Sequence, residues 1–462
     1  MPIQKVTIED LFNMPTAVIY NPDGYKPARY VSIDSRNIKK NSIFFAIKGD
    51  NFDGHVFVKE AVKKGAAAVV INRRKLKNFD SIRIPIITVD DTAKAYGDLA
   101  KTWREKLNAK VVSLTGSNGK TTTKEILATL LSEKYKVVKT EDNNNNHIGV
   151  PLTIFSANEK TEVLVLEHGT NHFNEIEYTA KIARPDFAFI TNIGNAHLEF
   201  LKSKEGVFNE KSSLLNETDL CGGKALINVD DPLLRGAGKN FKNRVTFGFT
   251  RNPDVKGEIL GYTIDGRTKI SIKNGHKNLE TVLPIYGASN ATNFLPAYVV
   301  AIKLGMTKKE INTAVNKLAG LNGRLKVIKK RKMILIDDTY NSSPESVKSG
   351  IDLVRNIKLH DRKILILGDM FELGFKSKKL HESLSDFISK NEISDVYLIG
   401  KYMKHLNSKL IKSQVNSRHC GTRKSLKDLL MKNNFEDSVV LVKGSRGMHM
   451  EDFLQIIANK AK

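Results

Sequence analysis

The sequence has little cysteine and no long apolar run, and both shortages narrow the classes of protein to which it can belong. The two cysteines among 462 residues, Cys221 and Cys420, lie far apart and form no CxxC motif, which argues against a disulfide framework or a zinc site. No stretch approaches the roughly 18 apolar residues that a membrane-spanning helix needs, and the N-terminus lacks the pattern of a secretion signal. We therefore expect a cytoplasmic protein without membrane insertion.

The formal net charge of +24 at pH 7 is the unusual feature of the composition. Such a charge suits nucleic acid, an anionic membrane surface or anionic small substrates. Its source is mainly lysine spread along the whole chain, whereas a surface that reads bases or grips phosphates favours arginine. The densest cluster, KKRK at residues 329–332, has no interleaved aromatic residues on which bases would stack. We interpret the charge as a solvated surface and expect no nucleic-acid binding.

Chain length and the order of the apolar runs predict an α/β protein of three domains. Residues 1–88 have the short runs of a small N-terminal α/β domain, with a helical pattern at residues 55–64. Residues 89–318 alternate strands and helices, which predicts a mainly parallel central sheet, with hairpins at its edge over residues 244–282. Residues 319–462 repeat the alternation and predict a C-terminal, doubly wound, Rossmann-like domain.

A glycine-rich loop, SLTGSNGKTTT at residues 113–123, stands between an apolar strand pattern and a helical pattern. Strand, loop and helix in that order are the setting in which a phosphate loop is credible. Gly116 and Gly119 permit a tight turn whose N–H groups converge on an anion. Lys120 would reach the outer phosphates, and Thr121 would offer a hydroxyl to Mg²⁺. The loop predicts a phosphate site but does not identify the reaction.

Two more candidates stand at the carboxyl ends of predicted strands, where ligands collect in parallel sheets. Glu167 follows the apolar residues 163–166 and would suit Mg²⁺, although an exposed strand end would fit the same pattern. His197 follows the apolar residues 187–190, and its spacing leaves open whether it binds a ligand or only forms a hydrogen bond.

Several motifs together resemble those of the Mur ligase family. The loop TGSNGKTT lacks the first glycine of the usual GxxxxGKT form, as the ATP loop of that family does. The other matching motifs are NNHIGVPLT at residues 145–153, EHG at 167–169, TNIGNAHLE at 191–199 and GR at 323–324. The resemblance covers all three predicted domains. It implies an ADP-forming amide ligase, in which ATP converts a carboxylate into an acyl phosphate that an amine then attacks.

Four stretches are most similar to the family member that adds D-alanyl-D-alanine to UDP-N-acetylmuramoyl-tripeptide during cytoplasmic peptidoglycan synthesis. They are DSR at 34–36 with DGH at 53–55, IDDTYNSSP at 336–344, LGDMFELG at 367–374 and KGSR at 443–446. The Asp-Asn-Pro-Arg signature of the sister ligase that adds the third, diamino residue is absent from the third predicted domain. Substrates spread over three domains also imply that the third domain closes over the site.

The resemblance implies roles for individual residues, and these are predictions. The ATP site would comprise Gly116, Ser117, Asn118, Gly119, Lys120, Thr121 and Thr122, with Asn290, Asn293, Arg324, Asp338 and Tyr340. The substrates would meet Ser35, Arg36 and His55 at the nucleotide sugar, Asn145 and Asn146, and Lys443, Ser445 and Arg446 at the dipeptide. The catalytic residues would be Lys120, Glu167, His197 and Lys211, and two Mg²⁺ ions would bind Thr121, Glu167, His197 and Lys211. Lys211 matches the family lysine that CO₂ carbamylates, whereas Ser289 departs from the family, which usually has histidine there.

Two alternative functions stay open from the sequence. One is another amide ligase of the same superfamily, such as a folylpolyglutamate synthase or a different Mur ligase, against which the motifs at residues 338–344 and 443–446 argue. The other is a phosphate-loop protein that uses ATP to regulate nucleic-acid binding, which the charge motivates. We expect a monomer whose partners are the UDP-linked tripeptide and D-alanyl-D-alanine. No motif tells whether the third peptide residue is lysine or diaminopimelate.

Overall fold

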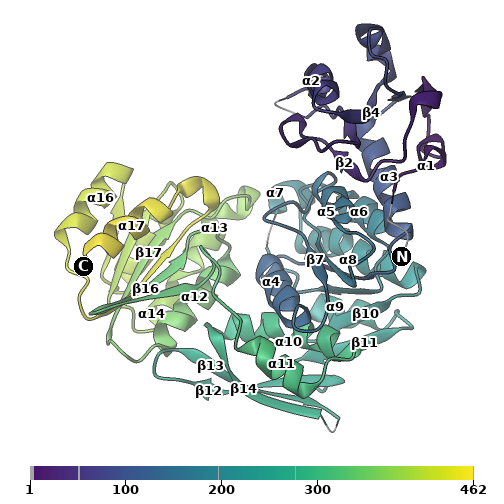
Figure 1. Ribbon diagram of the computed structural model, residues 1–462. Coiled ribbons are helices and arrows are strands. Elements are labelled where there is room, and N and C mark those ends of the chain that lie inside the picture. The colour runs from purple at the N-terminus through teal and green to yellow at the C-terminus, as the bar shows by residue number, and fades with distance from the viewer. Residues whose placement is uncertain (1–4, 50–51, 196, 276, 461–462) are drawn as a thin grey trace.

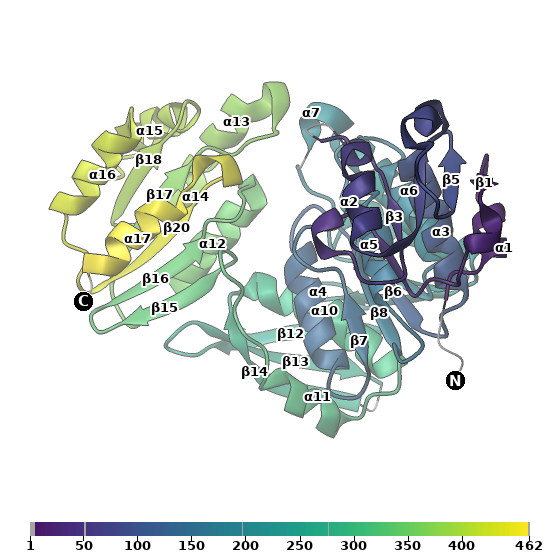
Figure 2. The same ribbon diagram turned by 45° about the horizontal axis from the view of Figure 1, so that its top comes forward.

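The computed structural model describes residues 5–49, 52–195, 197–275 and 277–460 (Figure 1). These residues form three sheets, each with its own helices, so the predicted α/β class with three domains is confirmed. Figures 1 and 2 show that the first domain packs against one end of the middle domain and that the third domain lies beside the middle domain. The predicted boundaries after residues 88 and 318 stay predictions, and residues 1–4, 461–462 and Ala196 of the TNIGNAHLE motif lie outside the described residues. None of the described helices is both long and apolar enough to cross a bilayer.

The first domain is built on a five-stranded sheet in which β1 alone runs antiparallel. Its strand order is β1 (Val18–Tyr20), β5 (Ile86–Val89), β4 (Ala66–Asn72), β3 (Ser42–Phe45) and β2 (Tyr30–Ser32). Its helices are α1 (Ile8–Phe12), α2 (Val58–Lys63) and the 3-10 turns η1 (Pro22–Gly24), η2 (Ser35–Asn37), η3 (Gly54–Phe57) and η4 (Arg73–Phe79). The helix predicted at residues 55–64 is thus divided between η3 and α2. The Asp53 side chain caps the 3-10 turn by accepting the His55 N–H.

The middle domain is built on a nine-stranded sheet whose last hairpins are antiparallel. Its strand order is β14 (Lys277–Tyr286), β13 (Arg267–Asn274), β12 (Val255–Tyr262), β11 (Arg244–Gly248), β10 (Lys224–Asn228), β9 (Phe187–Ile190), β6 (Lys110–Thr115), β8 (Val163–Glu167) and β7 (Val137–Lys139). The pairs from β7 to β12 are parallel. The hairpins predicted at the sheet edge over residues 244–282 are therefore confirmed for β12 to β14.

Helices cover both faces of the middle sheet. One face carries α4 (Lys120–Leu131), α10 (Ala288–Lys303) and α11 (Lys308–Val315), which share one core cluster with the sheet. The other face carries α3 (Thr92–Glu105), α5 (Gly149–Ser156), α6 (Glu175–Ala183) and α8 (Lys204–Leu220), with α7 (Leu198–Leu201) and α9 (Pro232–Gly238) nearby. This doubly wound arrangement puts the carboxyl ends of β6, β8 and β9 at one edge, where the phosphate loop begins.

The third domain is a six-stranded sheet with one antiparallel edge strand. Its strand order is β15 (Lys326–Lys330), β16 (Met333–Asp338), β20 (Ser438–Lys443), β17 (Arg362–Gly368), β18 (Asp395–Ile399) and β19 (Ser417–Cys420). Its helices are α12 (Pro344–Asn356), α13 (Ser377–Glu382), α14 (Ser385–Ser389), α15 (Met403–Lys412), α16 (Arg423–Lys432) and α17 (Glu451–Lys460), with the turns η5 (Gly374–Lys376) and η6 (Arg446–Met448). The parallel pairs from β16 to β19 match the Rossmann-like prediction.

Helix α3 joins the first domain to the middle domain, and Tyr96 lies at the centre of that junction. Asp91 caps the helix by accepting the N–H groups of Ala93 and Lys94. The Tyr96 ring is fully buried, with its centroid 5.2 Å from that of Phe45 in the first domain and 5.1 Å from that of Phe155 in the middle domain. Its hydroxyl finds no hydrogen-bond partner among the described residues, and burial raises its pKa.

Two substitutions of Tyr96 separate the contribution of its ring to stability from that of its hydroxyl. Tyr96→Ala should lower the free energy of unfolding by about 3–5 kcal/mol because a large buried ring is lost. Tyr96→Phe should raise it by about 1 kcal/mol because an unpaired buried polar group is removed. Urea unfolding measures both changes, with Tyr20→Phe at an exposed tyrosine of β1 as the control. Destabilisation by Tyr96→Phe would contradict the unpaired hydroxyl.

Candidate active site

One cavity of about 870 Å³ is lined by residues of both the middle and the third domain. Its lining includes residues that were predicted from motifs far apart in the sequence. The predicted site residues in its lining are Ser117, Asn118, Gly119, Lys120, Thr121, Thr122, Asn145, Asn146, Glu167, His197, Asn290, Asn293, Arg324, Asp338, Tyr340 and Lys443. Gly116, Ser35, Arg36, His55, Lys211, Ser445 and Arg446 are not among the lining residues.

The phosphate loop has the tight backbone that its glycines predict. Gly116 has a φ of 153° and Gly119, which caps α4, has a φ of 82°. A Cβ on Gly116 would lie 1.8 Å from Thr191 Oγ1, and one on Gly119 would lie 2.2 Å from Asn293 Oδ1. Both positions therefore need glycine for conformation and for space. Lys120 is the first residue of α4, and its Nζ donates to the Gly116 carbonyl at 2.8 Å.

Glu167 is a buried carboxylate at the end of β8. Its Oε1 accepts from Thr121 Oγ1 at 3.2 Å and from Asn145 Nδ2 at 2.9 Å. Its Oε2 has no hydrogen-bond partner among the described residues, and a buried carboxylate oxygen in that state is where a cation would be expected. Burial lowers the pKa of Lys120 against the opposing charge of Glu167. Thr121 and Glu167 thus fit the predicted Mg²⁺ ligands in kind and in position.

Lys124 is a residue of this cluster that the sequence reasoning missed. It is fully buried, and its Nζ donates to the backbone carbonyls of Thr140 at 2.6 Å and Asp142 at 3.4 Å. The same Nζ lies 3.9 Å from Glu167 Oε2. Residues four apart in a helix lie on one face, so its spacing from Lys120 was the available signal. Lys124 fixes the loop that carries Asn145 against the back of Glu167.

Lys211 lies on α8 with its side chain fully buried and its Nζ without a partner among the described residues. From the residues alone, it would have been read as a solvated surface lysine, and the structure shows the opposite. Burial, and then the positive charge of Lys120, hold the pKa of Lys211 well below its ordinary value, while Glu210 and Glu167 oppose that shift. Burial therefore makes the neutral amine easier to form than in an exposed lysine, and both Lys120 and Glu167 act on it through their charges.

Three polar contacts join the middle domain to the third domain across the cavity. Ser343 Oγ donates to Asn118 Oδ1 of the phosphate loop at 2.8 Å, and Asn195 Nδ2 donates to Glu345 Oε1 at 2.9 Å. His197 Nδ1 lies 2.8 Å from Glu372 Oε2, and this histidine holds the pKa of Glu372 below its ordinary value. The third domain therefore reaches the phosphate loop and His197 directly.

The predicted residues of the third domain largely contact one another. Lys443 Nζ donates to Asp338 Oδ2 at 2.6 Å and to the Asn341 carbonyl at 2.9 Å. Burial raises the pKa of Asp338, and the charge of Lys443 opposes that shift. This pair was not foreseen, because Asp338 was predicted at a ribose hydroxyl and Lys443 at the dipeptide. Both residues line the cavity, so a ligand that reaches either one meets the pair.

Two arginine side chains lie near the ring of Tyr340, and Ser445 contacts the loop over residues 369–374. The guanidinium of Arg324 lies 4.0 Å from the centre of the Tyr340 ring, and that of Arg446 lies 6.0 Å from it. Arg446 is exposed and pairs with Glu451 at 3.3 Å. Ser445 is buried, and its Oγ accepts the N–H of Phe371 at 2.8 Å. Ser445 thus holds the loop over residues 369–374, and its predicted contact with the dipeptide stays a prediction.

The predicted residues of the first domain lie away from this cavity. Ser35 is buried and donates to Glu60 Oε2 at 3.1 Å, whereas Arg36 is exposed and pairs with Asp34 at 2.9 Å. His55 is buried with Nδ1 2.6 Å from Asp53 Oδ1, and its Nε2 accepts the Asn72 N–H at 2.9 Å. Both ring nitrogens of His55 are occupied, and Arg36, although paired with Asp34, is the exposed residue of the three and so the most accessible to a nucleotide sugar. Their predicted substrate contacts stay predictions.

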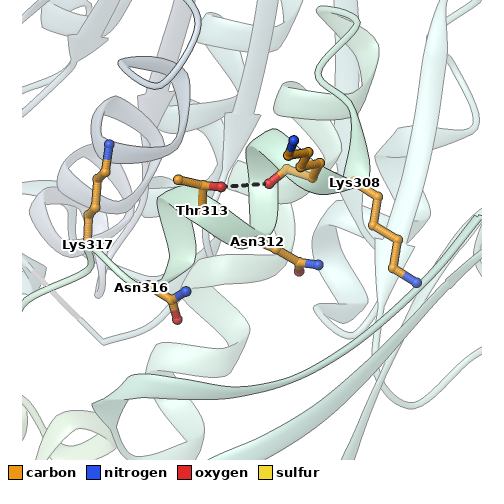
Figure 3. A pocket seen from close by; sticks show the side chains of 6 residues that line it. Lys308, Asn312, Thr313, Asn316 and Lys317 are labelled. Atoms are coloured by element: carbon orange, nitrogen blue, oxygen red, sulfur yellow. Dashed lines mark hydrogen bonds between the residues drawn. The ribbon is translucent and has the colours of Figure 1, made fainter.

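A second, open hollow of about 710 Å³ lies along α11 (Figure 3). The close-up shows Lys308 and Lys317 pointing away from each other, and the dashed line marks the hydroxyl of Thr313 donating to the carbonyl of Lys309 at 3.0 Å. None of the predicted site residues lines it. Within the described ranges, no group of three or more His, Cys, Asp or Glu side chains is placed to hold a metal ion.

Comparison with known proteins matches all three domains. The family model described as Mur ligase middle domain matches residues 114–301, that of the Mur ligase glutamate ligase domain matches 323–446, and that of the Mur ligase family catalytic domain matches 28–104. The chain is 33% identical over 455 residues to the UDP-N-acetylmuramoyl-tripeptide--D-alanyl-D-alanine ligase of Bacillus subtilis (strain 168), with 98% of each sequence covered.

Two solved structures are similar over nearly the whole chain. MurF from Acinetobacter baumannii superposes with a TM-score of 0.87 at 28% identity, with 100% of both chains covered. The MurF ligase from Thermotoga maritima in complex with ADP superposes with a TM-score of 0.82 at 29% identity, over 94% of this chain and 98% of that chain.

His168, directly after Glu167, is fully buried with a hydroxyl at each ring nitrogen. Nδ1 lies 2.8 Å from Thr179 Oγ1, and Nε2 lies 2.9 Å from Ser113 Oγ. Because Thr179 donates to the backbone carbonyls of its own helix, it accepts from Nδ1, which leaves Nε2 to accept from Ser113. Burial lowers the pKa of His168 to about 3, so the ring is neutral in the folded protein.

Acid should therefore destabilise the strands around His168. The folded pKa lies below the unfolded value of about 6.5, so the stability is present above pH 6.5 and is lost as the pH falls toward 3. Between pH 7 and pH 5 the loss should be about 2 kcal/mol, and His168→Gln should not show it. Hydrogen exchange of the β6 and β8 amides measures this, with His172→Gln at an exposed histidine as the control. An equal pH response in His168→Gln and the wild type would contradict the neutral ring.

Proposed function

We propose, because the chain belongs to the Mur ligase family, that it is an ADP-forming amide ligase that joins D-alanyl-D-alanine to UDP-N-acetylmuramoyl-tripeptide. The observation that carries this proposal is the single cavity in which the phosphate loop, Glu167 and His197 of the middle domain face Arg324 and Asp338 of the third domain. The B. subtilis relative and the MurF structures support the choice of substrates. A cytoplasmic location and a monomeric state belong to the same proposal.

The reaction proceeds in two steps, and the substrates alone supply every atom that is transferred. A carboxylate oxygen of the tripeptide attacks the γ-phosphorus of ATP, ADP leaves, and an acyl phosphate results. The amine of D-alanyl-D-alanine then attacks the acyl carbon, a C–N bond forms, phosphate leaves and one proton is released. Lys120, held at the Gly116 carbonyl, offsets charge on the transferring group, and Arg324 approaches it from the third domain.

Two Mg²⁺ ions at the residues around Glu167 belong to the proposal. Thr121 and Glu167 would hold the first ion, since Glu167 Oε2 is buried and accepts no hydrogen bond among the described residues. His197 and a carbamylated Lys211 would hold the second. When bound, the ions would offset negative charge on the phosphates. The protein contributes a buried carboxylate that the amide of Asn145 and the ammonium of Lys124 keep in place.

The lowered pKa of Lys211 supports its proposed carbamylation. The neutral amine is the nucleophilic form, and its nitrogen can add to the carbon of CO₂ while a proton leaves. The product carries a negative charge, which Lys120 would attract and Glu210 and Glu167 would oppose, whereas Lys120 would repel the unmodified ammonium. The modification therefore replaces an unpaired buried amine by an anion suited to a metal ion.

Lys211→Ala should reduce ligase turnover by at least about 10–100-fold, since loss of even the hydrogen-bond partners of metal ligands costs that much. Acetate or another short acid should restore part of the turnover by supplying the missing carboxylate. Phosphate release measures the rate, with Lys204→Ala in the first turn of the same helix as the control. Unchanged turnover of Lys211→Ala would contradict the proposal, as would the absence of a carbamate signal from the wild type in isotope-labelled bicarbonate.

Phosphate release from ATP, with each substrate omitted in turn, tests the whole function. Release should require both UDP-N-acetylmuramoyl-tripeptide and D-alanyl-D-alanine, because the acyl phosphate is consumed only by the dipeptide amine. Tripeptides with lysine and with diaminopimelate at the third position should be compared. Turnover that ignores the dipeptide would end the proposal. A salt-dependent affinity for DNA or RNA without peptide-dependent ATP cleavage would favour the nucleic-acid alternative instead.

A further inference from the structure

Glu372 and His197 meet across the boundary between the third and the middle domain, and both have unusual backbones. The φ of Glu372 is 62° and that of His197 is 53°. Non-glycine residues rarely adopt this left-handed region, and where they do the surroundings must hold them in it. The two side chains line the same cavity, with Nδ1 of His197 2.8 Å from Oε2 of Glu372. The structure thus holds two strained residues face to face at the proposed metal site.

The loop that carries Glu372, residues 369–374, is fixed by hydrogen bonds on both sides. The Met370 N–H donates to His381 Nε2 at 2.9 Å, and the Phe371 N–H donates to Ser445 Oγ at 2.8 Å. Ser445 in turn donates its own N–H to the Asp369 carbonyl at 3.0 Å. A loop held this way presents Glu372 in one position, which is what a residue with a positioning role requires.

The middle domain contacts the same loop through backbone atoms. The Glu199 N–H donates to the Glu372 carbonyl at 3.4 Å, and a Cβ on Gly374 would lie 3.6 Å from the Glu199 Cα. Figures 1 and 2 both show α7, which includes Glu199, on the side of the middle domain that faces α13 of the third domain. The approach of Glu372 to His197 therefore belongs to a packed junction of the two domains.

The contact leaves one nitrogen of His197 for a metal ion. Glu372 is opposite Nδ1, so Nε2 is the nitrogen that remains available. Nδ1 and the Glu372 carboxylate are close but form no hydrogen bond in this structure, so the contact is one of charge and distance. Metal-bound histidines commonly donate their other N–H to a carboxylate, and Glu372 is the carboxylate within reach of Nδ1 if Nε2 holds a metal ion.

We propose that Glu372 is a positioning residue that orients His197 from the third domain, so that the second metal site is complete only when the two domains are together. This inference rests on the proposed function for the existence of that site. It makes metal binding and domain closure mutually favourable, because each stabilises the same arrangement. The third domain would then contribute to the metal site through His197 without touching the ion.

Mn²⁺ binding to the full chain with ADP, followed by electron paramagnetic resonance, tests the proposal without any peptide substrate. Wild type should bind two Mn²⁺ ions. Glu372→Gln, which keeps the shape and removes the charge, should weaken one of them by about 10–100-fold and leave the other unchanged. Glu392→Gln is the matched control, because Glu392 also has a positive φ in the third domain but is exposed and outside the cavity lining.

A double-mutant cycle separates positioning from a general effect on folding. His197→Ala and the Glu372→Gln, His197→Ala double variant should bind the weaker ion equally poorly, because Glu372 acts only through His197. Glu372→Asp should restore part of the affinity. A single ion in the wild type, equal affinities in Glu372→Gln, or additive losses in the cycle would overturn the proposal. If dipeptide-dependent turnover fails while these results hold, the proposed function is wrong and the role of Glu372 stands.

Discussion

The carboxylate of Glu167 is the constraint on which the candidate site depends. It ends a buried strand, accepts from the first turn of α4 through Thr121 and from the following loop through Asn145, and has the buried ammonium of Lys124 behind it. Removing a charge from water is costly unless it is paired, so these partners are needed to keep the group in place. The side chain of Glu167 therefore connects three parts of the site: the edge of the sheet, the start of α4 after the phosphate loop, and the loop over residues 140–146.

The sequence predicted those features of the fold and of the site that depend on a local pattern of residues. The phosphate loop was recognised because strand, glycines and helix are adjacent in the chain, and Glu167 because it follows an apolar run. The Asp338–Lys443 pair and the role of Ser445 were not predicted, since each depends on a partner distant in sequence. Lys124 was not predicted either: its spacing from Lys120 is visible in the sequence, but its contacts with Thr140 and Glu167 are not. Strands β1 and β2 were not predicted for another reason. Each has only three residues, none of them buried, so neither produces an apolar run. The family resemblance supplied roles that spacing alone left open, above all for Lys211.

The two domain junctions differ in chemistry. The first and middle domains share a single hydrophobic cluster that runs from Val6 through helix α3 to Ala183. The middle and third domains meet at the cavity through polar contacts such as Ser343 with Asn118 and Asn195 with Glu345. Apolar burial resists separation, whereas polar groups exchange their partners for water at little net cost. A closing motion would therefore occur at the second junction.

The shared cluster around α3 also affects how the protein unfolds: the number of units that unfold cooperatively should be smaller than the number of sheets. A helix whose residues complete the cores of two domains cannot lose its packing in one while keeping it in the other. Heating should thus melt the first and middle domains together, and the third domain, which has its own two clusters, in a separate transition. Three domains by topology would then be two by calorimetry.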